Sequence, residues 1–376
     1  MIMSEEYRRR VAKLRALLQA RDYDLFIGST TDTLYYLTGA AFSQDERPVL
    51  FLVWADGRSQ LVAPLLEKTH IGGLVPWAEL RSYREYPAPE GLGWKTLSLE
   101  TCKAASRIAL EVLTRGEILQ ALGSKVSLEP FVDQLRLVKS RAELALIRRA
   151  AYYADRIVVK MREATVPGAT VARVFANASG VTQEAVDELG SRYTPFLTSF
   201  MPVPWPAPMN AEPHRLPCMS DTFDSGPHNL TSVTRFDAYS AESERVVFLE
   251  PPPSEVTQAH DAVVEARRRA FSMLRPGQPT SEIDFSVNSF LKSEGYENRL
   301  LHRTGHGFGL GGHEGPWIAE GATDVLEENM VISVEPGVYI PGVGGIRDSD
   351  TVLITPKGFE LLTQAPIVSQ RVVYES

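Results

Sequence analysis

A helix, a Pro-Gly turn and a second helix occur in the same order twice in this chain of 376 residues. The first copy has a helical pattern over 151–164 and its turn at 166–170, and the second has a helix over 260–274 and its turn at 275–280. A supersecondary unit that recurs predicts two related halves around a shared central sheet. The repeat therefore favours an α+β fold with internal pseudo-two-fold symmetry for the C-terminal part.

The N-terminal part has a different pattern, in which helices alternate with short apolar strands. Residues 5–21 carry an apolar stripe at helical spacing. Strands are predicted at 24–27, 49–54, 59–62 and 107–111, with a hairpin turn at 55–57. We therefore predict a two-domain α/β protein, with an α/β layer domain over 1–127 and a second domain over 128–376 that begins with a long helix at 141–163.

Charge and cysteine content exclude several classes of protein. The net charge is -8, whereas a nucleic-acid binder usually presents a basic face. No stretch approaches the roughly 18 apolar residues of a membrane helix, and the N-terminal segment is charged and amphipathic rather than a signal peptide. Cys102 and Cys218 are the only cysteines and fit a reducing compartment. We expect a cytoplasmic protein without nucleic-acid or membrane partners.

Three histidines within twelve residues mark the candidate site. His302, His306 and His313 lie in LLHRTGHGFGLGGHEGPW, with five glycines between the first and the last of these histidines. Glycine removes side chains around the histidines and lets a ligand or another strand approach closely. A lone histidine is more often structural, but this density favours a functional site.

Two further strands bring charged residues toward this segment. Glu335 interrupts the apolar strand of MVISVEPGVYI, where a carboxylate is costly unless it is paired or bound. An exposed strand end is the alternative. Arg347, Asp348 and Asp350 open the strand GGIRDSDTVLIT. A surface ion-pair cluster is one interpretation of these three residues, and it is the one adopted for Asp348. Residues 201–217 hold six prolines and are predicted to form an irregular loop.

These motifs resemble those of a known superfamily. TGHGFGLGGHE, SVEPGVYI and GGIRDSDTVLIT are similar to the C-terminal domain of the pita-bread hydrolases, which include methionine aminopeptidase, aminopeptidase P, prolidase and creatinase. YRRRVAKLRALLQARDYDLFIGSTTDTLYYLTG resembles the start of the creatinase/prolidase N-terminal domain. The resemblance spans nearly the whole chain and implies the pita-bread fold over 128–376.

The resemblance also implies a ligand set for two metal ions, and this chain departs from it. His306 and Glu335 match the family's His and first Glu. Glu242 stands where the family has its second Asp. Thr231 and Ser349 occupy the places of the first Asp and the second Glu, so two carboxylate ligands are lost. His214 matches the substrate-binding His of the family.

The remaining donors are too few for a dinuclear centre, because hard or borderline divalent ions need several carboxylate or imidazole ligands. We expect no metal cofactor, or at most one Mn, Zn or Fe ion held by Glu242, His306 and Glu335. Creatinase is a metal-free member of the superfamily, and this chain resembles it in carrying a Glu directly before the Arg of this segment. That residue is Glu244. The alternative for Glu244 is a solvated strand residue.

Three functions remain open. The first is a creatinase-like hydrolase of a C–N bond in a small polar or dipeptide-like substrate, with His214, Glu244, Glu335 and His313 as catalytic residues. The second is an Xaa-Pro dipeptidase or aminopeptidase P that uses at most one metal ion, and the third is an inactive binding scaffold. The residues expected to bind substrate are His302, His313, Arg47 and Arg347. By analogy with the family's dimers, we expect a homodimer in which Arg47 reaches a cleft of the same or the partner subunit.

Overall fold

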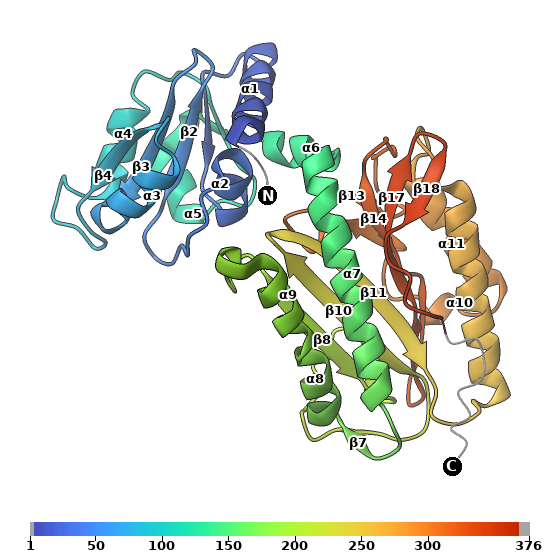
Figure 1. The fold of residues 1–376 in the computed structure, drawn as a ribbon. Coiled ribbons are helices and arrows are strands. Elements are labelled where there is room, and N and C mark those ends of the chain that lie inside the picture. The colour runs from blue at the N-terminus through green and yellow to red at the C-terminus, as the bar shows by residue number, and fades with distance from the viewer. Residues whose placement is uncertain (1–3, 368–376) are drawn as a thin grey trace. The chain divides into compact units, whose positions relative to one another are not determined.

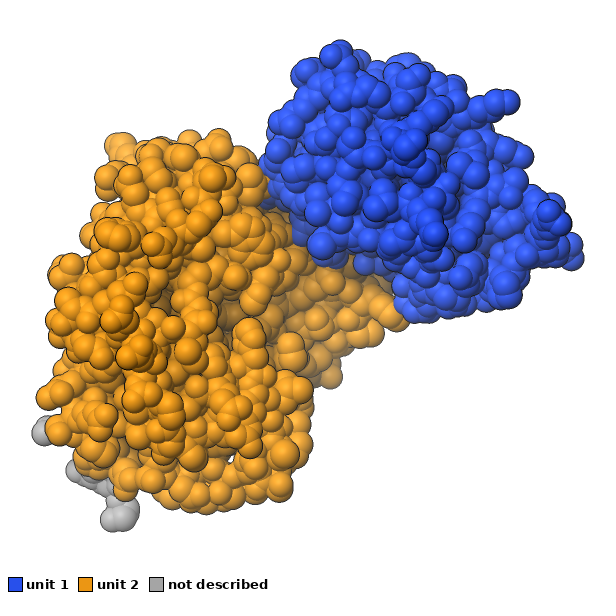
Figure 2. All heavy atoms as spheres, turned by 180° about the vertical axis from the view of Figure 1, so that it is seen from behind, with its two compact units in different colours: residues 1–136 blue, residues 137–376 orange. Residues whose placement is uncertain are grey.

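The structure is a computed structural model that describes residues 4–367. It divides into two compact units, one up to Arg136 and one from Leu137 on (Figure 2). The predicted two-domain α/β architecture is confirmed. The expected boundary between residues 127 and 128 stays a prediction.

The first unit is a six-stranded sheet with helices around it. Its strand order is β4-β3-β2-β1-β5-β6. The strands are β1 (Leu25–Gly28), β2 (Leu50–Trp54), β3 (Ser59–Pro64), β4 (Glu79–Tyr83), β5 (Ile108–Leu110) and β6 (Val126–Leu128). The helices are α1 (Ser4–Ala20), α2 (Thr31–Thr38), α3 (Lys68–Leu74), α4 (Trp94–Thr101) and α5 (Gly116–Leu122), and α6 (Phe131–Leu137) follows. The predicted hairpin is the antiparallel pair of β2 and β3.

The second unit is built on an eight-stranded sheet. Its order is β13-β12-β14-β17-β11-β10-β8, and β18 pairs with β17. The strands are β8 (Ser199–Trp205), β10 (His228–Phe236), β11 (Tyr239–Val247), β12 (Gly305–Gly307), β13 (Glu314–Ile318), β14 (Val331–Val334), β17 (Ser349–Thr355) and β18 (Gly358–Leu361). Two small sheets pair β7 (Ala169–Thr170) with β9 (Thr222–Phe223) and β15 (Gly337–Ile340) with β16 (Gly344–Arg347).

The helices of the second unit repeat as the sequence predicts. The first pair is α7 (Arg141–Ala164) and α8 (Val171–Ser179), and the second is α10 (Ser254–Met273) and α11 (Thr280–Ser293). In addition, α9 (Val181–Leu189) follows α8 (Figure 1). Ser140 begins α7 with a capping box in which its side chain and that of Glu143 each bond the other's backbone N–H. Each pair covers part of one shared sheet, which leaves the strands to carry the site.

The interpretation of residues 201–217 as wholly irregular is wrong, because Ser199–Trp205 forms the edge strand β8. Pro202 and Pro204 lie two residues apart in this strand. Residues at that spacing direct their backbone nitrogens the same way, so both prolines turn the missing donor away from β10. An edge strand tolerates this arrangement, whereas a central strand would lose ladder hydrogen bonds.

Candidate functional site

One face of three neighbouring strands carries the residues singled out on β10, β11 and β17. Thr231 lies directly opposite Glu244, and Glu244 lies directly opposite Ser349. Glu242 is two residues before Glu244 and therefore points to the same side. The side chains of Thr231 and Ser349 are buried together with both glutamates. The four residues that the family motifs align with ligand positions or with the creatinase Glu thus lie on one face of the sheet.

Glu244 is bound to two side chains that reach it from neighbouring strands. Its Oε1 accepts a hydrogen bond from Asn229 Nδ2 at 2.7 Å, and its Oε2 accepts one from Arg347 Nε at 2.7 Å. The carboxylate is fully buried, so the solvated-strand alternative for Glu244 is wrong. Burial raises the pKa of Glu244 to about 7, and the Arg347 charge opposes this rise. Burial acts to lower the pKa of Arg347, but the Glu244 charge acts to raise it. The net result is a pKa well above the usual value of an arginine.

Glu335 and His306 form a second buried pair. Glu335 Oε1 lies 3.1 Å from His306 Nε2, and both side chains are buried. Burial acts to lower the pKa of His306, but the Glu335 charge raises it and the net shift is upward. Burial likewise acts to raise the pKa of Glu335, and His306 turns the net shift downward. The expectation that Glu335 is paired within an apolar strand is confirmed.

The glycines around His306 are required by the close approach of neighbouring strands. A Cβ on Gly305 would lie 2.2 Å from the Ser333 carbonyl oxygen, and one on Gly307 would lie 2.0 Å from that of Gly315. These contacts belong to β14 and β13, which flank β12. The glycine-rich segment therefore places His306 in the sheet.

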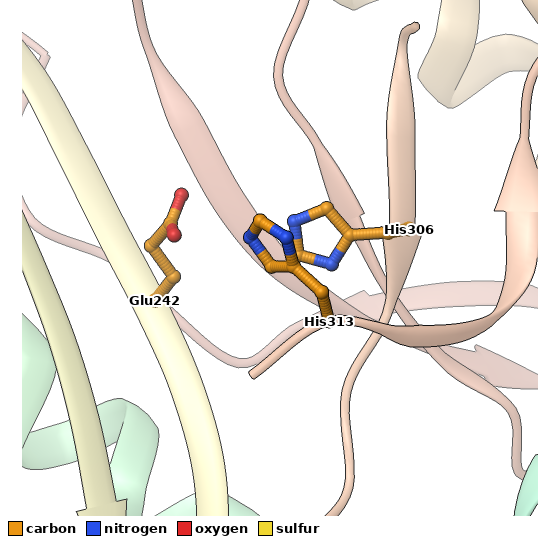
Figure 3. Close-up of side chains that lie close together, drawn as sticks. All are labelled: Glu242, His306 and His313. Carbon is orange, nitrogen blue, oxygen red and sulfur yellow. The ribbon is translucent and has the colours of Figure 1, made fainter. Parts of the chain in front are cut away.

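His313 lies against His306 and faces Glu242 (Figure 3). The two ring centroids are 3.9 Å apart, and one ligand atom from each of the three residues lies within 4.8 Å of the others. Partial burial and the neighbouring His306 lower the pKa of His313 to about 4. The side chain is otherwise exposed and is unprotonated near neutral pH.

His302 is partly buried, and both of its ring nitrogens make hydrogen bonds. Nδ1 lies 2.7 Å from the Arg303 carbonyl oxygen, so it carries the proton, and Nε2 accepts a hydrogen bond from Tyr339 at 2.7 Å. His214 is exposed in a turn, and its charge contributes to the lowered pKa of His313. Arg47 lies in the first unit, where it pairs with Glu46 and Glu85. Its role in substrate binding stays a prediction.

The surface ion-pair cluster expected at Arg347, Asp348 and Asp350 is wrong, because all three side chains are buried. Arg347 bonds Glu244 as described. Asp350 pairs with Arg245 at 2.7 Å and also with Arg267. Asp348 accepts a hydrogen bond from the Val246 backbone N–H. These three charged side chains are therefore partnered in the interior of the unit.

Two residues of the site escaped the sequence reasoning, namely Asn229 and Tyr339. Asn229 is two residues before Thr231 in β10, so alternation places it on the same face as Thr231. Tyr339 lies in β15, four residues after Glu335. The strand pattern held a signal for Asn229, whereas the contact of Tyr339 with His302 depends on tertiary packing.

The donor set does not fit a pair of metal ions. Thr231 and Ser349 offer hydroxyls in place of carboxylates, and neither hydroxyl makes a hydrogen bond. The set that fits a single ion is Glu242, His306 and His313, whereas the sequence reasoning took Glu335 as the third ligand. Glu242 Oε1 is buried without a hydrogen-bond partner. Carboxylate and imidazole donors of this kind suit Mn, Zn or Fe.

Sequence comparison assigns both parts of the chain. The profile of metallopeptidase family M24 matches residues 145–356, which is more than half of the chain. The chain belongs to metallopeptidase family M24. The creatinase/prolidase N-terminal domain matches residues 10–138. As an M24 protein, the chain is a hydrolase that acts on carbon–nitrogen bonds, and its family uses divalent metals.

Relatives of this M24 protein extend over nearly its whole length. An uncharacterized peptidase of Staphylococcus aureus is 26% identical over 358 residues, which is 94% of this chain and 98% of the relative. The dipeptidase PepE from Mycobacterium ulcerans has a TM-score of 0.85 and 25% identity, covering 97% of each chain. The prolidase from Pyrococcus horikoshii has a TM-score of 0.79 and 22% identity, covering 96% of this chain and 99% of its own. The pita-bread fold is thereby confirmed.

Proposed function

We propose that this M24 hydrolase cleaves a C–N bond in a small polar or dipeptide-like substrate without a pair of metal ions. The observation that carries the proposal is the internal pairing of the buried carboxylates. Glu244 is paired with Arg347, and Glu335 is paired with His306. A buried carboxylate needs a charged or hydrogen-bonding partner, and here the protein supplies that partner itself.

The proposed chemistry is acid–base hydrolysis by the histidines and Glu335. His313 is unprotonated near neutral pH and is free to accept a proton from water. The water oxygen adds to the carbonyl carbon, and the C–N bond breaks once the leaving nitrogen takes up a proton. We assign delivery of that proton to His214, which is exposed and whose charge acts on His313. Glu335 holds the substrate and the attacking water, and His302 lines the site from the Tyr339 side.

Glu244 enters this scheme through Arg347. Both of its carboxylate oxygens accept hydrogen bonds from protein side chains. We therefore assign Glu244 the role of orienting Arg347, whose guanidinium would bind the substrate. In this role Glu244 does not contact the substrate directly. Direct contact would require the substrate to displace Arg347 from Glu244.

A second candidate is an Xaa-Pro dipeptidase with one metal ion. Two observations favour it: the grouping of Glu242, His306 and His313, and the similarity to solved prolidases and dipeptidases. A single bound ion would supply Lewis-acid polarisation of the substrate carbonyl. The protein residues would then hold the ion and the dipeptide ends.

We further propose a cytoplasmic homodimer. Within residues 4–367, no helix is long and apolar enough to cross a membrane. Cys102 is buried and Cys218 exposed, and neither forms a disulfide. Free thiols suit a reducing compartment. Arg47 would act on a site of the same or the partner subunit.

A substrate panel measured with and without chelator tests the function. The panel comprises Xaa-Pro dipeptides, other dipeptides and small polar amides and ureas. We expect turnover of at least one C–N substrate that survives excess chelator and is lost in Glu335→Gln. Turnover that a chelator abolishes and Mn²⁺ restores would instead support the one-metal dipeptidase. Absence of any turnover, with binding retained, would favour the inactive scaffold.

A further inference from the structure

Among the buried glutamates Glu242, Glu244 and Glu335, only Glu242 lacks a basic side chain paired with it. Its Oε1 is buried and makes no hydrogen bond, while Glu244 and Glu335 each have a basic partner. Its backbone N–H and C=O are satisfied by Thr351 Oγ1 at 2.9 and 2.8 Å, so only the carboxyl end is left open. An unpaired buried carboxyl group costs free energy unless a ligand completes it.

Two hydroxyls on the neighbouring strands are left open in the same way. Thr231 Oγ1 and Ser349 Oγ are buried and make no hydrogen bond. Both residues lie opposite Glu244, one on each side of β11, and Glu242 is the next residue on that face. The Ser349 hydroxyl is also near enough to interact with the Glu242 carboxyl, although their contact lacks normal hydrogen-bond geometry.

Hydroxyls on the opposite face of the same strands provide a contrast. Thr234 donates to the Ala150 carbonyl oxygen at 2.9 Å, and Ser243 donates to Asp155 at 2.8 Å. Ser232, also on that face, lacks a partner but is directed toward α7 rather than the site. Three acceptors that converge on one surface, namely a carboxylate and two hydroxyls, therefore await a group rich in N–H donors.

We propose that Glu242, Thr231 and Ser349 form the binding subsite for a positively charged nitrogen group of the substrate, either an ammonium or a guanidinium. The inference rests on the proposed function, because it identifies the substrate class of the same site. The charges support a single cation. Arg347 pairs with Glu244 and His306 pairs with Glu335, so Glu242 is the carboxyl group that one further cation would complete. Burial raises the pKa of Glu242, and a bound cation would favour its charged form.

The shape of the acceptor set agrees with such a ligand. A cationic N–H group donates to a carboxylate through a charge-assisted hydrogen bond and to hydroxyls through ordinary ones. Because the acceptors lie on three adjacent strands, a planar guanidinium with donors on several edges fits the span more fully than an ammonium does. Methylguanidinium is therefore expected to bind more tightly than methylammonium, and the reverse order would assign the subsite to an ammonium.

Binding of small probes tests the subsite without requiring turnover. Methylguanidinium and methylammonium are titrated into the protein and followed by chemical-shift changes, with neutral N-methylacetamide for comparison. We expect both cations to bind the parent more tightly than the neutral probe. Glu242→Gln should weaken the cations by about 10- to 100-fold, which is the worth of a hydrogen bond to a charged group. Thr231→Val and Ser349→Ala should each weaken them by about 3- to 10-fold.

Matched variants guard against general damage. Thr231→Ser keeps the hydroxyl and should retain binding, and Ser232→Ala removes a partnerless hydroxyl outside the subsite and should change nothing. Glu242→Gln is expected to fold, because its Oε1 has no hydrogen bond to lose. If Glu242→Gln does not fold, weaker cation binding by Thr231→Val and Ser349→Ala tests the subsite in its place.

Equal binding of the neutral probe, or full cation binding by Glu242→Gln, would overturn the subsite. The same conclusion follows if Mn²⁺ binds the parent and excludes the organic cations through Glu242, since the subsite then belongs to a metal. Cation binding without any C–N cleavage would leave the subsite standing and reject the proposed function.

Discussion

At the scale of single residues, the pair of Glu335 and His306 sets the charge state of the site. The pKa of His306 is raised and that of Glu335 is lowered. Stability from the raised His pKa is complete below the unfolded value and is lost as pH rises through the folded value. Stability from the lowered Glu pKa is present above its unfolded value and is lost as pH falls through the folded value. Both contributions are therefore complete in a window of roughly pH 5–6.

Glu335→Gln removes the charge that raises the pKa of His306. Burial then dominates, so His306 should titrate at lower pH than in the parent. An NMR titration of the His306 ring protons measures the shift, and His228, which Asp224 contacts instead, serves as the unchanged reference. The stability gap between parent and variant should narrow as pH rises above the His306 pKa. A His306 titration identical in the two proteins would rule out the pairing.

At the scale of elements, Glu244 joins three segments of the second unit. Its carboxylate connects β11 to Asn229 on β10 and to Arg347 at the end of β16. The small β15–β16 sheet is thereby tied to the large sheet beside the site. Strand alternation made the common face of Glu242 and Glu244 predictable. The partners of Glu244 were not, because they depend on the register of three strands.

Glu244→Gln should destabilise the protein by about 3 kcal/mol, because it leaves the buried Arg347 without its charge partner. Denaturant unfolding measures the change. The matched control is Glu360→Gln, which breaks the exposed pair with Arg148, whose two side chains are each 44% exposed. That change should cost no more than about 0.5 kcal/mol. Equal effects of the two substitutions would mean that Glu244 makes no special contribution.

The same scale shows why parts of the chain resisted prediction. Apolar periodicity located the long helices α1, α7 and α10 and the strands β1, β2 and β3, since burial of one face dictates the residue pattern. The strand β8 escaped because its two prolines suggest a loop, and only its place at the sheet edge makes them acceptable. Asp348 and Asp350 were placed on the surface because their buried partners, including Arg245 and Arg267, are distant in sequence.

At the scale of the whole molecule, the fold is that of metallopeptidase family M24. Motif spacing in the sequence was sufficient to predict this fold, and the proposal that Thr231 and Ser349 stand at lost ligand positions rests on the same spacing. His313 was predicted as a catalytic and substrate-binding residue, but its grouping with Glu242 and His306 was not. Glu335, which was expected in that group, pairs with His306.

The triple change Thr231→Asp, Glu242→Asp and Ser349→Glu restores the family's ligand set. The added carboxylates would lack partners without metal, so the variant should be less stable than the parent until Mn²⁺ or Zn²⁺ is added. Its melting temperature should then rise with metal concentration, and some Xaa-Pro cleavage should appear. A parent that gains as much stability from metal as the variant would show that these positions do not govern metal binding.

We propose that hydrolysis by this protein does not use two metal ions, and elemental analysis of the active enzyme tests this most directly. The protein is purified, dialysed against metal-free buffer and shown to retain C–N cleavage before its metal content is measured. With hydroxyls at Thr231 and Ser349, at most one equivalent of divalent metal per chain is predicted. Two tightly held equivalents per active chain would contradict the account.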